Sequence, residues 1–180
     1  DIAFAADCRR IAECLGNGVS IPYGPRDDKM VLRITAKPRH TRETDAGERI
    51  VLPWLRARGI ARLDGLVVSH LDVDHSGGAA SILRGLPVGR VLSSVPGDSA
   101  VLAGAGTVER CEAGQRWSQG DLDFEVLHPR AADYAAGLGT NALSCVLAIR
   151  AGTWRLLLTG DLPAREEGAL AARAALAADW

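Results

Sequence analysis

The pattern of apolar and polar positions in the first two thirds of the chain predicts strands that alternate with helices. The largely apolar run 63–68 is typical of a buried strand. A helix is predicted over 43–59, with Asp45 as a suitable N-cap and Gly59 as its stop, and a shorter helix over 79–86. Further strands are expected at 30–34, 89–94 and 107–111. The strand–helix–strand order indicates an α/β fold.

The last third of the chain has a different pattern, typical of half-buried strands. Residues 115–127 alternate between apolar and polar side chains, which predicts a strand with a turn before it, around 119–121. The segments 143–150 and 154–158 predict a hairpin across Ala151 and Gly152. A final helix is predicted over 163–177, because Pro163 is favoured just inside a helix start.

Composition limits the class of protein. With 180 residues, of which 47% are hydrophobic and 24% charged, the chain can bury a sizeable core, and we expect a single domain over 1–180. No membrane span and no signal peptide are indicated. The net charge of −1 gives no overall field to attract nucleic acid, so any polyanion would have to be bound locally.

The four cysteines have no C-x-x-C spacing, which argues against a structural zinc site. Cys145 lies in an apolar run and is interpreted as a core residue. A disulfide between Cys8 and Cys14 is an open alternative. The cysteines therefore do not decide the cellular compartment.

Four residues able to bind a metal ion directly follow the predicted strand 63–68: His70, Asp72, Asp74 and His75. In an extended backbone His70 and Asp72 project to the same side, while Asp74 and His75 lie where the chain turns. Imidazole and carboxylate ligands suit Zn²⁺, Mn²⁺ or Fe²⁺. The alternative is a polar loop in which Asp74 or Ser76 caps the next helix.

Other polar residues could contribute to such a site. Asp161 also follows a predicted strand, and it is either the N-cap of the last helix or a bridge between two metal ions. His128, at another strand end, is a further ligand or an edge histidine bonded to the backbone. Arg39 and Arg42 belong to a basic run that could bind phosphate, or that is simply a solvated loop.

These motifs resemble those of a known family. The run His70-x-Asp72-x-Asp74-His75-Ser76-Gly77-Gly78 is similar to the metallo-β-lactamase superfamily signature H-x-[HD]-x-D-H-x-G-G, and Thr159-Gly160-Asp161 is similar to its later aspartate motif. Within roughly 39–178 the chain resembles the C-terminal domain of ComEC-type competence proteins, inner-membrane channels for DNA uptake. The segments that carry this resemblance are 43–49, 53–56, 69–70, 127–129, 141–147 and 156–161.

The resemblance implies a fold and a location. The expected fold is a metallo-β-lactamase-like αββα sandwich, in an extracytoplasmic (periplasmic) domain of an inner-membrane protein. The expected partners are DNA and the membrane channel portion of the same parent protein. Residues 1–38 form an atypical N-terminal region relative to the family, and a later His-His-Gly-Ser motif is expected beyond Trp180, so part of the fold is expected to be missing.

The resemblance also implies an activity, hydrolysis of phosphodiesters in the DNA strand that does not enter the cell. Two divalent metal ions, zinc or manganese, would serve as cofactors, with His70 and Asp72 on one, Asp74 and His75 on the other, and Asp161 between them. Asp74 is the candidate catalytic residue. Asn141 and Ser144, with Arg39 and Arg42, are candidates to bind substrate. A catalytically weak domain that guides DNA or contacts the channel, and a hydrolase of a small phosphodiester or a lactone, remain as alternatives.

Overall fold

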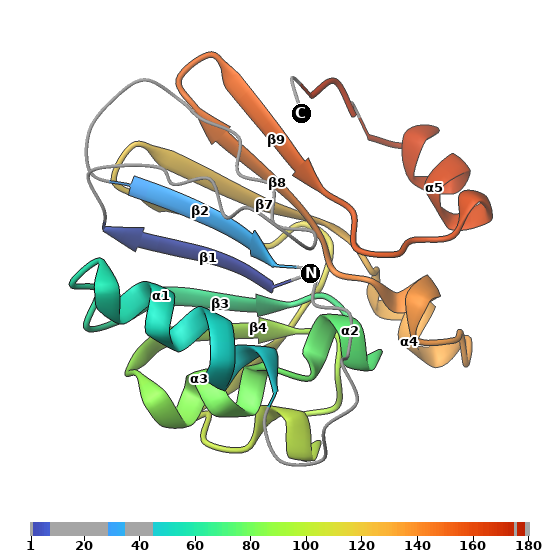
Figure 1. The fold of residues 1–180 in the computed structure, drawn as a ribbon. Coiled ribbons are helices and arrows are strands. Elements are labelled where there is room, and N and C mark those ends of the chain that lie inside the picture. Colours follow the sequence, from blue (N-terminus) through green and yellow to red (C-terminus); the bar gives the residue numbers. More distant parts are fainter. Residues whose placement is uncertain (1, 8–28, 35–44, 175, 179–180) are drawn as a thin grey trace.

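Two β-sheets stacked face to face form the centre of the molecule (Figure 1). The structure is a computed structural model that describes residues 2–7, 29–34, 45–174 and 176–178. Among these residues the first sheet has the strand order β2-β1-β3-β4-β5, and the second has the order β6-β7-β8-β9. The strands of the first sheet are β1 (Ile2–Asp7), β2 (Lys29–Ile34), β3 (Leu63–Val68), β4 (Val88–Ser93) and β5 (Val108–Arg110).

The first sheet is mixed. Strands β3, β4 and β5 are parallel, whereas β1 pairs antiparallel with both β2 and β3. The three parallel strands need crossover connections, and the one between β3 and β4 contains the short helix α2 (Val73–Ser76) and α3 (Ala79–Gly85). The strands predicted at 63–68, 30–34, 89–94 and 107–111 are thus confirmed, with ends that differ by at most one residue.

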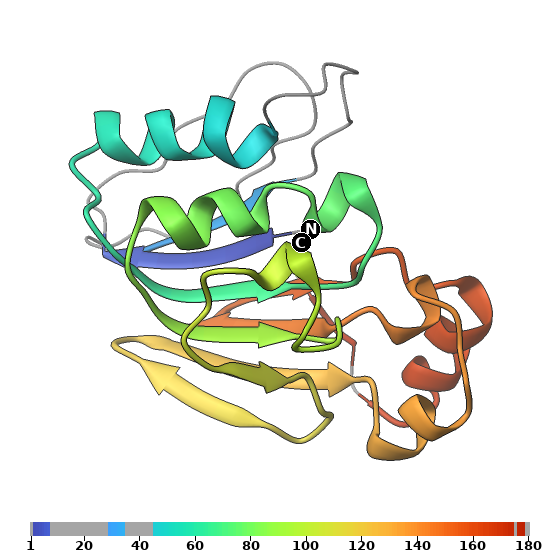
Figure 2. The ribbon, with the colours of Figure 1, turned by 90° about the horizontal axis from the view of Figure 1, so that it is seen from below.

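Helices cover the outer face of the first sheet (Figure 2). The segment predicted as a helix over 43–59 is helical from η1 (Gly47–Val51) through α1 (Leu52–Ala57), and the carboxylate of Asp45 accepts the backbone N–H of Glu48 at 3.0 Å. Asp45 thus bonds like the N-cap it was predicted to be. Its other carboxylate oxygen accepts the hydroxyl of Ser81 in α3 at 2.7 Å, which ties the two helices together.

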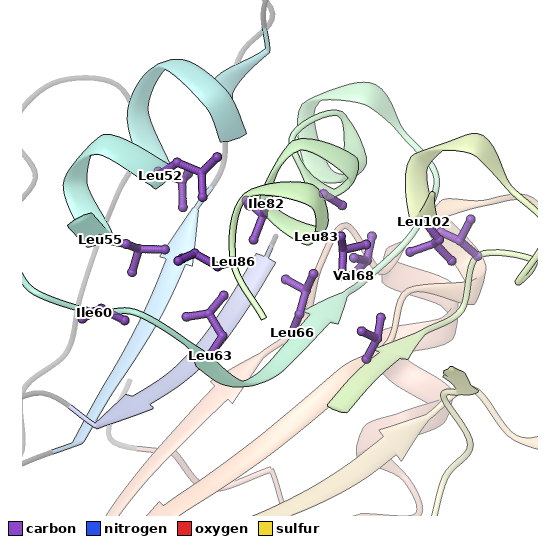
Figure 3. Close-up of a cluster of buried hydrophobic side chains, with 14 residues drawn as sticks. Leu52, Leu55, Ile60, Leu63, Leu66, Val68, Ile82, Leu83, Leu86 and Leu102 are labelled. Atoms are coloured by element: carbon purple, nitrogen blue, oxygen red, sulfur yellow. The ribbon is translucent and has the colours of Figure 1, made fainter. Parts of the chain in front are cut away.

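Strand β3 is buried on both faces along its second half, which explains why residues 66–68 are continuously apolar. Leu66 and Val68 are fully buried among leucines and isoleucines of the helices, as Figure 3 shows. Val67 points the other way and packs in the core between the two sheets, with Leu92 of β4 and Phe124 of the second sheet. A strand held from both sides is a rigid support for whatever follows it.

The loop after β3 lies against the start of the helical segment 47–57 at a pair of glycines. A Cβ atom on Gly47 would lie 2.1 Å from the carbonyl oxygen of Gly78, and one on Gly78 would lie 2.7 Å from the amide nitrogen of Gly47. Only glycines permit this backbone approach. The second glycine of the 70–78 motif therefore has a packing role that fixes the position of the loop.

The second sheet is an antiparallel meander of β6 (Arg116–Gln119), β7 (Leu122–His128), β8 (Val146–Ala151) and β9 (Trp154–Leu158). The hairpin predicted across Ala151 and Gly152 is confirmed. The turn predicted around 119–121 is confirmed, because Gly120, at φ 55°, turns the chain between β6 and β7. The strand predicted after this turn is β7, whereas β6, before the turn, is a second strand that the prediction of a single strand did not include.

The helix predicted over 163–177 is shorter in the structure. Helix α5 spans Ala164–Ala171, and Leu170 is its buried residue. Of the described residues that follow, Ala172, Ala177 and Ala178 are small and exposed, and they offer little apolar surface to hold a longer helix against the sheet. No helix in the described part of the chain is long and apolar enough to cross a membrane.

A disulfide joins Cys111, just after β5, to Cys145, just before β8. Both residues are buried in the core between the sheets, so the prediction that Cys145 is a core residue is correct as to burial but missed the covalent bond. The alternative pair, Cys8 and Cys14, lies outside the described residues, as do Arg39 and Arg42.

Candidate metal centre

The ends of two strands, one from each sheet, bring the chemically active residues together (Figure 1). His70 follows β3 by two residues, and the short helix α2 carries Asp74 and His75. Asp161 follows β9. Residues 70 and 161 are far apart in sequence but meet because both strands end on the same side of the molecule.

Three side chains converge on one point. Ligand atoms of His70, His75 and Asp161 all lie within 4.8 Å of one another. The Nε2 atom of His75 is 3.1 Å from Oδ2 of Asp161, and the two imidazole rings lie with their centroids 4.2 Å apart. Two imidazoles and a carboxylate at this separation form a donor set that suits zinc or manganese.

The other two carboxylates of the motif lie beside this cluster. Asp74 Oδ2 is 3.5 Å from His75 Nε2, and Asp72 Oδ2 is 4.0 Å from His70 Nε2. Both carboxylates are partly exposed, whereas the two histidines are buried. The sequence grouped His70 with Asp72 and Asp74 with His75. In the structure the single turn of α2 brings the two histidines to each other as well, so all five residues border one site.

Burial keeps both imidazoles neutral. It lowers the pKa of His70 to about 4, assisted by the neighbouring His75, and it also lowers the pKa of His75, against the opposing charges of Asp161 and Asp74. A neutral imidazole has a free lone pair with which it can bind a metal ion. The three carboxylates around the two neutral rings make the site electronegative, which favours a cation.

An unpartnered atom marks where a ligand fits. Nε2 of His70 is buried and has no hydrogen-bond partner within the described part of the chain. Such a buried polar atom is costly unless a ligand uses it. The residues present therefore fit a metal ion bound by His70, His75 and Asp161.

The capping alternatives receive no support. Neither Asp74 nor Ser76 caps a helix here: α2 begins after Asp72, α3 begins after Gly78, and no side chain makes a capping hydrogen bond at either start. Ser76 instead donates to the carbonyl of Leu71 at 2.7 Å. Helix α5 also lacks a side-chain cap, so Asp161 is not its N-cap.

The structure also defines the surroundings of two further residues named from sequence, Ser144 and His128. Ser144 was predicted to bind substrate, but it is completely buried, which leaves it no surface to offer a substrate. His128 Nε2 donates to the carbonyl of Ala142, 2.8 Å away, as in the backbone-bonded alternative. Asn141 remains partly exposed near the site and stays a candidate for substrate contact.

Several residues around the site were not singled out from sequence. Thr140 donates its hydroxyl to Asp72 at 2.7 Å, and Ser94 donates to the carbonyl of Ser69 at 2.5 Å. The hydroxyl of Ser69 itself lies 3.1 Å from Nδ1 of His70. The only sequence signal was their position beside the motifs, because hydroxyl residues are common in loops.

Gly160 holds Asp161 in place through both its backbone angle and its lack of a side chain. Its φ is 59°, and a Cβ atom there would lie 2.9 Å from both Cβ and Oγ of Ser144. We expect Gly160→Ala to weaken metal binding about tenfold or more, and to lower the free energy of unfolding by about 1–3 kcal/mol. Titration with Zn²⁺ and urea unfolding measure the two effects.

Gly152 provides the control, because its φ is 60° but nothing lies within 4 Å of a Cβ placed there. Gly152→Ala should cost stability of the same order through the backbone angle alone, and leave metal affinity unchanged. Equal metal affinity in both variants would contradict the importance of the close contact at Gly160.

Comparison with known proteins agrees with this geometry. Residues 37–176 match the family model described as the metallo-beta-lactamase superfamily. The chain is 38% identical over 125 residues to competence protein ComA of Neisseria gonorrhoeae, covering 69% of this chain and 16% of that protein. It is 37% identical over 125 residues to ComE operon protein 3 of Bacillus subtilis, covering 64% of this chain and 16% of that protein.

A third relative, recombination protein 2 of Haemophilus influenzae, is 35% identical over 117 residues, covering 65% of this chain and 14% of that protein. The chain thus matches only about one sixth of the length of these curated relatives. The family model, in contrast, covers most of the chain and includes every residue of the site, and the two stacked sheets agree with the expected sandwich. This chain belongs to the metallo-β-lactamase superfamily.

Proposed function

We propose that this chain is the metal-dependent phosphodiesterase domain of a DNA-uptake protein, and that it cleaves the DNA strand that does not enter the cell. The observation that carries the proposal is the convergence of His70, His75 and Asp161 around the unpartnered Nε2 atom of His70. The names of the relatives, which include a competence protein, a ComE operon protein and a recombination protein, support DNA as the substrate.

The disulfide supports a location outside the cytoplasm. Disulfides form and persist in oxidising compartments and are rare in the cytosol. The Cys111–Cys145 bond is buried in the core between the sheets. We therefore place the domain on the extracytoplasmic side of the membrane, joined to the channel portion of a longer parent protein.

The residues of the site have separable roles in this proposal. His70, His75 and Asp161 hold the metal, and Asp72 and Asp74 complete the ligand set for up to two ions, zinc or manganese. Such ions supply Lewis acidity towards phosphoryl oxygens and lower the pKa of coordinated water toward about 7. Asp74 has a partly exposed carboxylate 3.5 Å from His75 Nε2, where it can orient the attacking water and accept its proton.

The test is a cleavage assay on the purified chain. Labelled single-stranded and duplex DNA, and bis(p-nitrophenyl) phosphate as a small diester, are incubated with added Mn²⁺ or Zn²⁺ and with EDTA. We expect DNA cleavage that EDTA abolishes and that Asp74→Asn reduces by about a hundredfold, since general acid–base groups contribute roughly 10²–10⁴-fold.

Asp64→Asn is the matched control, because Asp64 lies near the opposite end of β3, beside Arg62. It should cleave DNA like the unchanged chain. Cleavage of the small diester alone would overturn DNA as the substrate. Metal-loaded protein that binds DNA without cutting it would overturn the nuclease activity and favour a DNA-guiding role.

A further inference from the structure

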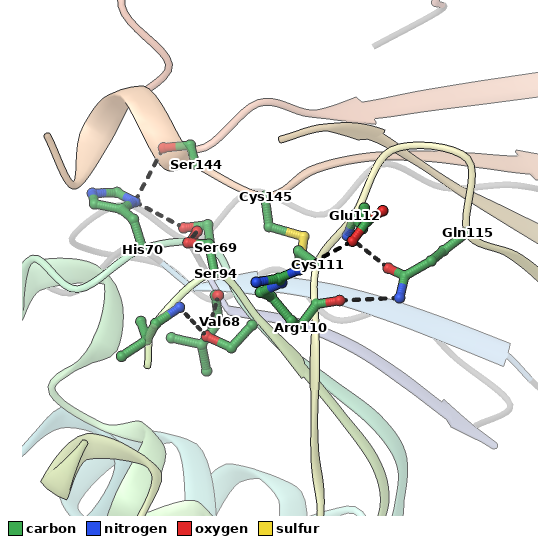
Figure 4. The surroundings of a disulfide bond; sticks show 12 residues. Val68, Ser69, His70, Ser94, Arg110, Cys111, Glu112, Gln115, Ser144 and Cys145 are labelled. Carbon is green, nitrogen blue, oxygen red and sulfur yellow. Dashed lines mark hydrogen bonds and ion pairs between the residues drawn. A yellow bond between two sulfur atoms is a disulfide. The ribbon is translucent and has the colours of Figure 1, made fainter. Parts of the chain in front are cut away.

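Two serine hydroxyls lie against the other nitrogen of His70, the one that faces away from the metal site (Figure 4). Ser69 Oγ is 3.1 Å from Nδ1, and Ser144 Oγ is 3.4 Å from the same atom. Ser144 is completely buried and Ser69 nearly so. The two hydroxyls come from opposite sheets, since Ser69 follows β3 and Ser144 precedes β8.

The hydroxyl of Ser144 also contacts the third candidate ligand. The backbone N–H of Asp161 donates to Ser144 Oγ at 3.3 Å. A single buried oxygen atom thus bridges His70, in the segment after β3, and Asp161, in the segment after β9. Because Gly160 packs directly against the side chain of Ser144, this contact also determines how closely Asp161 approaches.

The hydrogen bonds available to His70 favour one tautomer. A proton on Nε2 would be a buried donor without an acceptor, because that atom has no hydrogen-bond partner among the described residues. A proton on Nδ1 would find two hydroxyl oxygens within reach. Leaving a buried N–H unsatisfied is costly, so the proton belongs on Nδ1 and the lone pair on Nε2.

We propose that Ser144 is a positioning residue, whose hydroxyl oxygen accepts hydrogen bonds from Nδ1–H of His70 and from the backbone N–H of Asp161. These two bonds direct the Nε2 lone pair of His70 and the carboxylate of Asp161 into one site. This inference rests on the proposed metal site and assigns Ser144 a role other than substrate contact. Complete burial also excludes it as a nucleophile, although it lies beside a histidine. Metal-binding histidines generally require such a partner on their second nitrogen.

The first test reads the tautomer directly in the metal-free protein. Long-range ¹H–¹⁵N correlation spectra of ¹⁵N-histidine protein at pH 7 distinguish protonated Nδ1 from protonated Nε2. The chain has four histidines, and His70→Gln identifies the signals of His70. We expect His70 to be protonated at Nδ1. Protonation at Nε2 would overturn the proposal whether or not the protein cleaves DNA.

The second test measures Zn²⁺ affinity by competition with a chromophoric chelator. Loss of an outer-shell partner typically costs about 10–100-fold in metal affinity, and we expect Ser144→Ala to fall in this range, while Ser69 keeps His70 protonated at Nδ1. Ser118→Ala is the control, because Ser118 is exposed and bonds to Asp123 on the second sheet. The Ser118→Ala variant should change neither the zinc affinity nor the tautomer of His70.

Unchanged zinc affinity in folded Ser144→Ala would also overturn the proposal. If the Ser144→Ala variant does not fold, the tautomer of His70 in the unchanged chain is the deciding test of the proposal. If the unchanged chain binds no metal, the proposed function fails, and the tautomer still reports on the role of Ser144.

Discussion

Replacing His70 by glutamine is expected to abolish tight binding of a divalent metal ion while leaving the metal-free protein folded. His70 supplies the one buried, unpartnered nitrogen of the cluster, and a neutral amide is a much weaker ligand than imidazole. We expect the affinity for Zn²⁺ to fall by on the order of a thousandfold, which is about 4 kcal/mol. DNA cleavage should fall with it.

Metal content after dialysis and thermal unfolding with and without Zn²⁺ measure this loss. A ligand at a hundredfold excess over its Kd stabilises the folded state by about 2.7 kcal/mol. For a chain of this size that raises the Tm by about 5–10 °C. The unchanged chain should show this rise, and His70→Gln should show none.

His128→Gln is the matched control, because His128 is a second buried histidine near the end of a strand. Its Nε2 lies 2.8 Å from the carbonyl of Ala142, a contact that glutamine can partly replace. This variant should retain metal binding even if its Tm is lower. Stoichiometric zinc in His70→Gln would refute the assignment of His70 as a ligand.

Sequence predicted best those elements whose local pattern also determines their packing. The run 63–68 is apolar apart from Asp64 because β3 is covered on both faces, and its ends were predicted to the residue. The hairpin at Ala151 and Gly152 follows from two apolar runs joined by a two-residue turn. In both cases the information lies within a few neighbouring residues.

Sequence could not predict which distant residues meet. That His70 and His75 face each other depends on the single helical turn α2, and Asp161 joins them only because β3 and β9 end on the same side. The burial of Ser144 depends likewise on Gly160 packing against it. Motif spacing named the ligand candidates but could not separate a residue that contacts substrate from one that holds a ligand in place.

The disulfide was missed for the same reason, and it leads to the second large effect. Cys111 and Cys145 are 34 residues apart, a distance at which sequence spacing carries no pairing information. The bond links the end of β5 in one sheet to the start of β8 in the other. Cys145 also donates its backbone N–H to the carbonyl of Ser69 at 2.8 Å, directly beside His70.

The double variant Cys111→Ala, Cys145→Ala is expected to lose about 4 kcal/mol in the free energy of unfolding, because a loop of 34 residues is no longer closed in the unfolded chain. Urea unfolding measures the loss, which corresponds to a fall in Tm of roughly 10 °C. Dithiothreitol should destabilise the unchanged chain in the same direction and leave the variant unaffected.

The variant Cys8→Ala, Cys14→Ala distinguishes this bond from the pairing considered from sequence. It should keep the urea midpoint of the unchanged chain, and its Cys111 and Cys145 should resist alkylation until a reductant is added. Free alkylation of both cysteines in the folded, unreduced protein would refute the disulfide. Because Cys145 anchors the segment of Ser69 and Ser144, breaking the bond should also weaken zinc binding, which would couple the assembly of the metal site to an oxidising environment.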